Sequence, residues 1–353
     1  MECGIVGLPG CGKTTLFNAL TGAQVSAFGG GGAGLKPNVG MANIPDPRLA
    51  VIAKYVPTKK LTYATIKFVD IPGVPAGSDA AKLNAFLGHV RQVEAVCHVV
   101  RCFGGDANPA KDIDQMDTDL VLADMQIAEN GLEKSARAAK GPDVEAKARV
   151  ATLEKVLPVL NEGKALRSVT TWTPADHKVL QTYGMITHKP VMFVANVEEG
   201  DVNGESAAAK AVKAHAEGHG SKSVVVCAKL EAELAEIEEV ERGEMLASMG
   251  LKEPAIGPLA RAVNELLGLA CFYTAGEPEV RAWQIVRGAT APQAAGAIHS
   301  DIERGFIRAE CFSFDDLVKH GSEKAVKEAG RLRSEGKGYV MADGDIVHFL
   351  FNV

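Results

Sequence analysis

The sequence predicts an α/β fold: a mostly parallel sheet with helices on both faces, an inserted α-helical hairpin and a smaller C-terminal sheet domain. Short apolar runs alternate with segments of helical periodicity along most of the 353 residues, as a parallel sheet requires. A glycine-rich turn directly follows the first apolar run, and polar residues end several later runs, where such sheets bind ligands. The 46% apolar content is enough for the buried cores of two or three domains.

The first strand, residues 3–6, leads into GLPGCGKT at residues 7–14, which matches a phosphate-binding loop. Its glycines let backbone N–H groups curl around phosphates, Lys13 reaches the outer phosphates, and the Thr14 hydroxyl can ligate Mg²⁺ at the positive end of the following helix. The expected nucleotide contacts are Gly10, Cys11, Gly12, Lys13, Thr14 and Thr15. We therefore expect a nucleoside triphosphate, with Mg²⁺ as cofactor. The alternative is a glycine-rich helix start that binds nothing, which the strand–loop–helix context disfavours.

The next apolar strand, residues 66–69, ends at Asp70, which we expect to face Mg²⁺ through a water molecule. Gly73 completes an Asp-x-x-Gly turn, and its backbone N–H is placed to sense the γ-phosphate. The predicted metal residues are thus Thr14 and Asp70, and the predicted catalytic residues are Lys13, Thr14, Asp70 and Gly73.

Three further buried strands are predicted at residues 95–100, 191–195 and 224–227. Between the first two, apolar residues recur at helical spacing on either side of Gly141-Pro142, which predicts two antiparallel helices inserted into the sheet domain. Lysines and arginines outnumber acids between residues 134 and 167. This excess has two interpretations, a solvated face of a long helix pair or a tip that binds a polyanion.

The strand at 191–195 ends in Asn196-Val197-Glu198-Glu199, where guanine-specific relatives carry Asn-Lys-x-Asp. The short acid of that motif accepts two hydrogen bonds from guanine, and the longer side chain of Glu199 cannot make the same compact contact. Adenine offers no such pair of donors. We therefore expect guanine selectivity to be lost and ATP to be accepted or preferred.

The C-terminal region predicts a second, smaller sheet. Its expected strands are residues 271–274, 280–286, 307–312 and 346–351, arranged around a helix at 291–304. A β-grasp sheet is the natural result. Because the charges of this region nearly balance, contact with RNA would rest on shape and on a few side chains such as Arg281, Arg304 and Arg308.

Longer motifs run along nearly the whole chain. They are CGIVGLP at 3–9, PDPRL at 45–49, FVDI at 68–71, HVVRCF at 98–103, VANV at 194–197, VRAW at 280–283, GATAPQAAG at 288–296, GFIRA at 305–309, DGDI at 343–346 and FNV at 351–353. Together they resemble the YchF subfamily of the Obg-related P-loop NTPases. The motifs after residue 280 resemble the TGS domain of that family, a β-grasp fold.

This resemblance implies an ATPase, also able to take GTP in some members, whose hairpin and TGS domain engage the ribosome. The expected partner is the ribosome or its large subunit, and contact with rRNA is an open possibility. It implies that Asn196 and the backbone of Val197 hold the adenine, and that the Cys227-Ala228 turn adds base contacts. The implied domains are a nucleotide-binding domain at 1–110 and 185–267, the hairpin at 111–184 and the TGS domain at 268–353.

Two departures from the family pattern concern the ions at the phosphates. Gly10-Cys11 stands where family members have Asn-Val, and that Asn is the kind of side chain that helps a monovalent cation approach. Alignment on Pro37-Asn38 places Gly34 where the first switch of the family has a Thr that caps Mg²⁺. The glycine run around Gly34 is either a flexible loop or a remodelled switch.

Two more departures concern the attacking water. Val74 stands where a GTPase has its catalytic Gln, as an apolar residue does in this subfamily, and the loop at 104–109 contains no His, which the family is proposed to use there. The nearest histidines in sequence are His89 and His98, and we expect both to be structural. Slow intrinsic hydrolysis that a partner accelerates is therefore expected.

Composition narrows the function further. The formal charge of −6 argues against a uniformly basic nucleic-acid binder. Seven scattered cysteines indicate reduced core thiols, and we expect no metal besides Mg²⁺. No membrane segment is predicted, so we expect a cytoplasmic protein. Two functions remain: a nucleotide-dependent switch acting on the ribosome or an associated factor, or a metabolic or signalling ATPase whose C-terminal domain is a small-ligand regulatory module.

Overall fold

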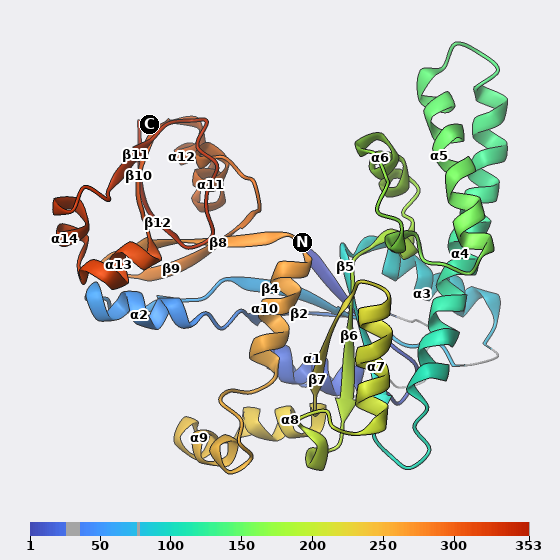
Figure 1. Ribbon diagram of the computed structural model, residues 1–353, viewed down its shortest axis with the longest axis horizontal. Coiled ribbons are helices and arrows are strands. Elements are labelled where there is room, and N and C mark those ends of the chain that lie inside the picture. The colour runs from blue at the N-terminus through green and yellow to red at the C-terminus, as the bar shows by residue number, and fades with distance from the viewer. Residues whose placement is uncertain (26–35, 76–77, 353) are drawn as a thin grey trace. The chain divides into compact units, whose positions relative to one another are not determined.

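The computed structural model describes residues 1–25, 36–75 and 78–352 (Figure 1). Its first sheet has the strand order β2-β4-β1-β5-β6-β7. These strands are β1 (Glu2–Val6), β2 (Asn38–Asn43), β4 (Thr65–Asp70), β5 (Ala95–Cys102), β6 (Val191–Val197) and β7 (Lys222–Val226). The pairs β1–β4, β1–β5, β5–β6 and β6–β7 are parallel. The predicted α/β fold is therefore confirmed, and β2 is an additional strand that the sequence did not predict.

Helices cover this sheet, and α1 and α7 lie on opposite sides of it (Figure 1). Their bounds are α1 (Lys13–Thr21), α3 (Ala80–Gln92), α7 (Ala207–Gly218), α8 (Ala228–Glu236) and α9 (Glu239–Ser248). Apolar side chains of α3, α7 and α8 share one buried cluster with the sheet strands, including Phe86, Val212 and Leu230. Among the described residues, every helix is too short or too polar to span a lipid bilayer.

The predicted hairpin consists of α4 (Pro109–Ala138) and α5 (Val144–Asn161), which pack against each other. Asn108 caps α4 by accepting a hydrogen bond from the Lys111 amide, and Pro109 occupies the first turn, where no amide donor is required. A separate apolar cluster joins the two helices to α6 (Pro174–Thr182).

Many basic side chains of the hairpin are ion-paired. The pairs are Arg137–Glu133, Arg149–Asp143, Lys155–Asp176, Lys164–Glu162 and Arg167–Asp117. Since pairing cancels much of the local positive charge, it favours a solvated helix face over a tip that binds a polyanion.

The second sheet has the strand order β11-β10-β12-β8-β9-β3. Its strands are β3 (Leu61–Thr62), β8 (Leu269–Ala275), β9 (Val280–Val286), β10 (Phe306–Ser313), β11 (Arg333–Glu335) and β12 (Asp345–Phe351), with helices α10 (Ile256–Leu266), α11 (Ala291–Ile298), α12 (Ser300–Arg304), α13 (Phe314–His320) and α14 (Glu323–Glu328). The single helix predicted at 291–304 is divided, because His299 has an extended backbone and caps α12 with its side chain.

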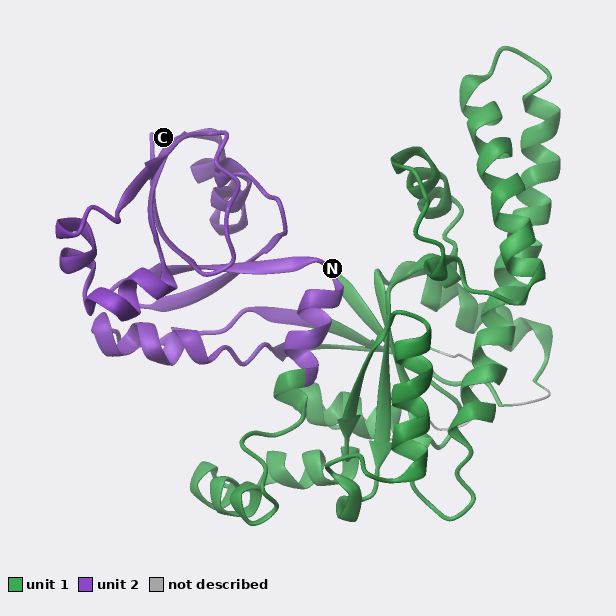
Figure 2. Cartoon of the chain, in the orientation of Figure 1, with its two compact units in different colours: residues 1–41, 67–258 green, residues 42–66, 259–353 purple. Residues whose placement is uncertain are grey.

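The chain forms two compact units (Figure 2). Unit 1 comprises residues 1–41 and 67–258, and unit 2 comprises residues 42–66 and 259–353. This division differs from the one expected from the sequence, which assigned 42–66 to the nucleotide-binding domain. The reason is that α2 (Pro47–Tyr55) and β3 fold with the C-terminal sheet, to which β3 adds a strand.

Candidate nucleotide-binding site

The predicted phosphate loop joins β1 to α1. Gly12 caps α1 with φ +91° and, having no side chain, offers no capping acceptor to the first amides of the helix, so these amides can face an anion. A Cβ at Gly12 would lie 2.1 Å from Nδ2 of Asn196. Glycine is therefore required here both by its backbone conformation and by the close approach of Asn196.

Lys13 and the turn after β4 meet beside this loop. The Lys13 side chain is buried, and its Nζ donates a hydrogen bond to the Leu8 carbonyl oxygen at 3.3 Å. A Cβ at Gly73 would lie 2.5 Å from the Gly7 carbonyl oxygen and 2.9 Å from Lys13 Nζ. Two predicted catalytic residues, Lys13 and Gly73, are thus adjacent, and the turn fits against the loop only because residue 73 has no side chain.

The predicted metal side of the site is centred on Asp70, which is 2% exposed. Its Oδ2 accepts hydrogen bonds from Thr14 Oγ1 at 2.9 Å and from Asn38 Nδ2 at 3.3 Å. Its Oδ1 is buried and has no hydrogen-bond partner in the part of the chain that the structure describes. A buried carboxylate oxygen without a partner is costly unless a ligand or water satisfies it.

These residues fit Mg²⁺, which prefers oxygen ligands and commonly shares one or two protein groups with substrate phosphates. The described residues hold no cluster of three or more His, Cys, Asp and Glu side chains suited to a metal ion. Gly34, predicted at the position of the Mg²⁺-capping Thr, lies outside the described residues. Asn38 was not predicted as a site residue, because the strand that it begins, β2, was not predicted either.

Asn196 links the phosphate loop to the predicted base side. Its Nδ2 donates to the Cys11 carbonyl oxygen at 2.8 Å, and its Oδ1 accepts from the Ala228 amide at 2.9 Å. The side chain is 4% exposed. Because an amide side chain has two donors and two acceptor positions, Asn196 retains capacity for a base, and its contact with adenine stays a prediction.

Other residues predicted at the base side occupy different environments. The Val197 side chain is buried in the core, which leaves only its backbone for a base. Cys227 caps α8 rather than ending a strand, and burial raises the pKa of its thiol. Glu199 is exposed on the short helix η3 (Glu199–Asp201). Its neighbour Glu198 accepts a hydrogen bond from the Gly104 amide at 2.7 Å.

The two histidines nearest in sequence to the missing catalytic one have structural surroundings. His98 is fully buried in β5, its ring centroid 5.5 Å from that of Phe193, and burial lowers its pKa to about 4. His89 is half-buried on α3. The loop after β5 is held by an ion pair between Arg101 and Asp106 at 3.0 Å.

A strand, a left-handed glycine turn, a helix N-terminus with Lys and Thr, and a carboxylate ending the neighbouring strand together define a P-loop nucleoside triphosphatase. Residues 2–131 match a family model described as "50S ribosome-binding GTPase", and residues 269–352 match the model YchF-GTPase_C, described as "Protein of unknown function".

Similarity to known proteins extends over the whole chain. The chain is 44% identical to "Ribosome-binding ATPase YchF" of Escherichia coli O157:H7, with 100% of this chain and 99% of that one covered. It is 41% identical to the protein of the same name from Bacillus subtilis, with 100% of both chains covered. The solved structure of the Schizosaccharomyces pombe YchF GTPase is 29% identical, with a TM-score of 0.86 over 99% of this chain and 97% of that one. The chain belongs to the YchF family.

Proposed function

We propose that the protein is a Mg²⁺-dependent ATPase of low intrinsic rate whose nucleotide state controls its binding to the ribosome. The observation that carries the nucleotide part is the contact of Thr14 and Asp70 beside the glycine-capped N-terminus of α1, with one buried Asp70 oxygen that has no hydrogen-bond partner among the described residues. The ribosome part draws on the relatives, which carry the name ribosome-binding ATPase.

ATP is the proposed nucleotide because the residues after Asn196 lack the guanine-reading pattern. Val197 is buried where guanine-specific relatives have Lys, and Glu199 is an exposed glutamate where they have Asp. Asn196 keeps one donor and one acceptor position beyond its bonds to Cys11 and Ala228, and we propose that it contacts the adenine together with backbone groups of β6 and of the turn before α8. GTP is an accepted substrate in this proposal but not the preferred one.

Thr14 and Asp70 would hold Mg²⁺, Thr14 through its hydroxyl and Asp70 through a water molecule on Oδ1. When bound, the ion would supply positive charge that neutralises the negative charge developing on the phosphates during phosphoryl transfer. Lys13 contributes a second positive charge from the protein, and the Gly73 amide contributes a hydrogen-bond donor. Asn38 holds Asp70 by occupying its other oxygen.

We propose slow hydrolysis because the positions that orient the attacking water in related enzymes carry no suitable polar side chain here. Val74 packs against the apolar core of unit 1, so the position used by the Gln of GTPases offers no polar group. His98 is buried beside Phe193, and the loop at 104–109 has no His. We propose that the ribosome or an associated factor supplies or orders the group that orients water.

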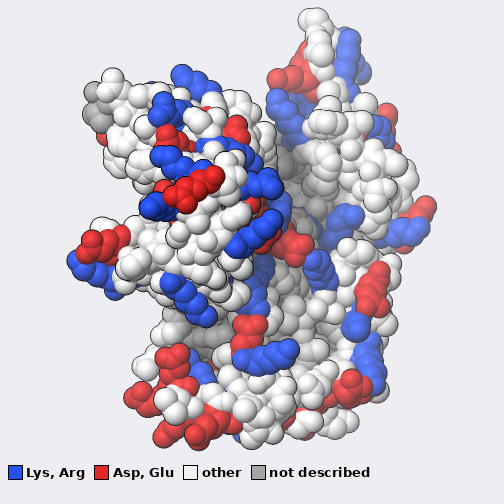
Figure 3. Space-filling model, turned by 60° about the vertical axis from the view of Figure 1, so that its left-hand side comes forward, with Lys and Arg blue, Asp and Glu red and all other residues white. Residues whose placement is uncertain are grey.

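The surface agrees with limited, local contact to RNA. Figure 3 shows Lys and Arg side chains interspersed with Asp and Glu side chains on the visible face. Arg304 and Arg308 are paired with Asp301 and Glu310, whereas the Arg281 guanidinium lies over the Trp283 ring at 3.9 Å from its centroid. We propose that recognition rests on such individual side chains, in the cytoplasm where ribosomes act.

Two measurements test this function. Calorimetric titration with ADP, GDP and their nonhydrolysable triphosphate analogues should show that adenine nucleotides bind at least about tenfold more tightly, or by about 1.4 kcal/mol. Lys13→Ala serves as the blank.

Co-sedimentation with purified ribosomes should then differ between the ATP-analogue and ADP states. Tighter guanine binding refutes the proposed base preference, and equal sedimentation in both states refutes the switch.

A further inference from the structure

The segment 42–66 belongs to unit 2 but is inserted between two strands of the nucleotide site. It leaves unit 1 through β2, which begins at Asn38, and returns through β4, which ends at Asp70. Asn38 and Asp70 are hydrogen-bonded to each other at the metal side of the site. The segment therefore starts and ends at the two strands that carry these side chains.

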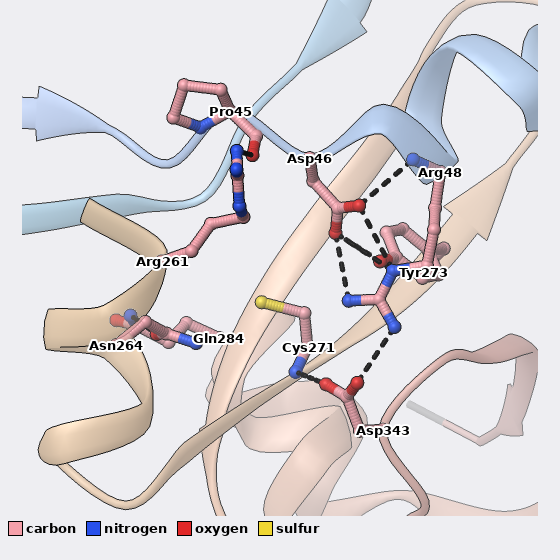
Figure 4. A network of polar contacts seen from close by, with 9 residues as sticks. All are labelled: Pro45, Asp46, Arg48, Arg261, Asn264, Cys271, Tyr273, Gln284 and Asp343. Carbon is pink, nitrogen blue, oxygen red and sulfur yellow. Dashed lines mark hydrogen bonds and ion pairs between the residues drawn. The ribbon is translucent and has the colours of Figure 1, made fainter. Parts of the chain in front are cut away.

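A polar network fastens the beginning of this segment to the C-terminal sheet (Figure 4). The Asp46 carboxylate accepts hydrogen bonds from Tyr273 and from Arg48 Nε, the latter at 3.0 Å. Arg48 Nη1 reaches Asp343 Oδ2 at 2.8 Å, and Asp343 Oδ1 accepts from the Cys271 amide at 2.8 Å. Arg48 thus bridges a carboxylate of the segment and a carboxylate of the C-terminal chain.

Burial makes this network costly to break. Tyr273 is fully buried, and burial together with the Asp46 charge raises the pKa of its phenol. The hydrogen bonds from Arg48 and Tyr273 keep the pKa of Asp46 below its usual value despite burial. A charged carboxylate in this position requires its donors, since losing one leaves a buried charge short of a partner.

The end of the segment is fastened separately. β3 pairs with β9 in parallel, with Leu61 opposite Val280. The Lys59 amide donates to the Glu277 carbonyl oxygen, and the Val280 amide donates to the Lys60 carbonyl oxygen, both at 2.9 Å. Both the beginning and the end of the segment are therefore hydrogen-bonded to elements of the C-terminal sheet.

We propose that segment 42–66 is the connection through which the ribosome, bound to unit 2, acts on the metal side of the nucleotide site. This inference rests on the proposed function. Extended strands transmit displacement along their length, so a shift of the segment changes how Asn38 and Asp70 lie toward Mg²⁺ and the phosphates. By linkage, the nucleotide state changes ribosome affinity by the same factor.

A competing route runs through α10, which also crosses from unit 1 to unit 2. Its start is held by Glu231 of α8, whose carboxylate accepts from the amides of Ala255 and Ile256 at 2.8 and 3.3 Å. Because α8 begins at the Cys227-Ala228 turn, this route would act on the base side instead. The two routes make different predictions for Arg48 and Glu231 variants.

The test measures ribosome affinity of the full chain by co-sedimentation in two states, with Mg²⁺ and either ADP or a nonhydrolysable ATP analogue. For the unmodified protein we expect the two affinities to differ by about fivefold or more. Without ribosomes, Arg48→Ala should bind nucleotides as the unmodified protein does. With ribosomes, the ratio of its affinities in the two nucleotide states should fall to less than about twofold. Lys324→Ala removes an exposed ion pair within α14 and should keep the full ratio, as should Glu231→Gln.

The remaining outcomes are decisive. A folded Arg48→Ala protein that keeps the full ratio overturns the inference, and so does a loss of the ratio in Glu231→Gln alone. If Arg48→Ala does not fold, Tyr273→Phe replaces it, because this variant removes only one hydroxyl from the same carboxylate. If the unmodified protein binds ribosomes equally well with ADP and with the ATP analogue, the proposed switch function itself fails. That result is known before any variant is compared.

Discussion

The two oxygens of Asp70 have different surroundings, and this difference predicts how a substitution of Asp70 affects Mg²⁺ binding. Oδ2 is bonded to Thr14 and Asn38, whereas Oδ1 has no hydrogen-bond partner among the residues described. Asp70→Asn keeps the size of the side chain but removes the charge that we propose holds Mg²⁺ through water, so we expect Mg²⁺ affinity and ATP hydrolysis to fall about 10- to 100-fold. Hydrolysis measured over a Mg²⁺ titration checks this. Asp79→Asn, which alters only the cap of α3, is the control, and an unchanged Mg²⁺ dependence in Asp70→Asn would contradict the metal assignment.

His98 carries a prediction on pH and stability. Its pKa is about 4 in the folded protein because of burial, against about 6.5 in an unfolded chain. The unfolded state therefore binds the proton more readily, so this contribution to stability is complete above pH 6.5 and is lost as the pH falls toward 4. The loss is about 1.4 kcal/mol for each pH unit in that interval.

The neighbouring groups Asp117, Arg167 and His215 also influence His98, so the comparison must be between variants. We expect the free energy of unfolding of His98→Leu, measured with urea at several pH values, to depend less steeply on pH than that of the unmodified protein. His348→Gln, which changes an exposed histidine, should show the unmodified slope. Equal slopes in all three proteins would mean that His98 is protonated in the folded state as readily as in the unfolded one.

At the scale of an element, the turn after β4 depends on Gly73. A Cβ there would overlap the Gly7 carbonyl oxygen and approach Lys13 Nζ. Overpacking of this kind costs about 1–3 kcal/mol, so we expect Gly73→Ala to weaken binding of the ATP analogue by about tenfold or more. Calorimetric titration checks this.

The matched control for Gly73→Ala is Gly88→Ala. Gly88 lies within α3 with no atom inside 4 Å of an added Cβ, so alanine there should leave nucleotide binding unchanged and stabilise the protein by about 0.5–1 kcal/mol. If both variants bind the analogue equally well, the turn does not pack on the loop in the bound state.

The elements of the site differ in how far the sequence predicts them. The phosphate loop, Asp70 and Asn196 follow from local motifs, because each residue type is required by the chemistry within a few positions of a buried strand. Asn38 escaped prediction because its role is set by a partner on another strand. β2 was also missed, since Asn38–Asn43 contains glycine and two asparagines, which are poor strand formers.

For the whole molecule, the membership of segment 42–66 could not be read from the sequence. It depends on pairs such as Arg48 and Asp343, which are 295 residues apart along the chain, and on the pairing of β3 with β9. Local patterns report helices and strands but not which distant strand a short segment joins. The motif at 45–49 was recognised as a family feature, and the structure adds that its Asp46 and Arg48 hold the segment on the second sheet.

This arrangement predicts that α2 unfolds and refolds together with unit 2. Removing the Tyr273 hydroxyl leaves the buried Asp46 carboxylate short of one donor, which costs about 1–3 kcal/mol. In native-state hydrogen exchange of Tyr273→Phe, we therefore expect protection to fall together in α2, β8 and β9 while β1 and β5 keep theirs. Tyr183→Phe is the matched control, because that hydroxyl contacts Ser135 in the hairpin of unit 1 and its loss should lower protection in α4 and leave α2 unchanged. Should α2 instead exchange with β1 and β5 in both variants, segment 42–66 would belong energetically to unit 1 despite its contacts, and the ribosome signal would need another path to Asp70.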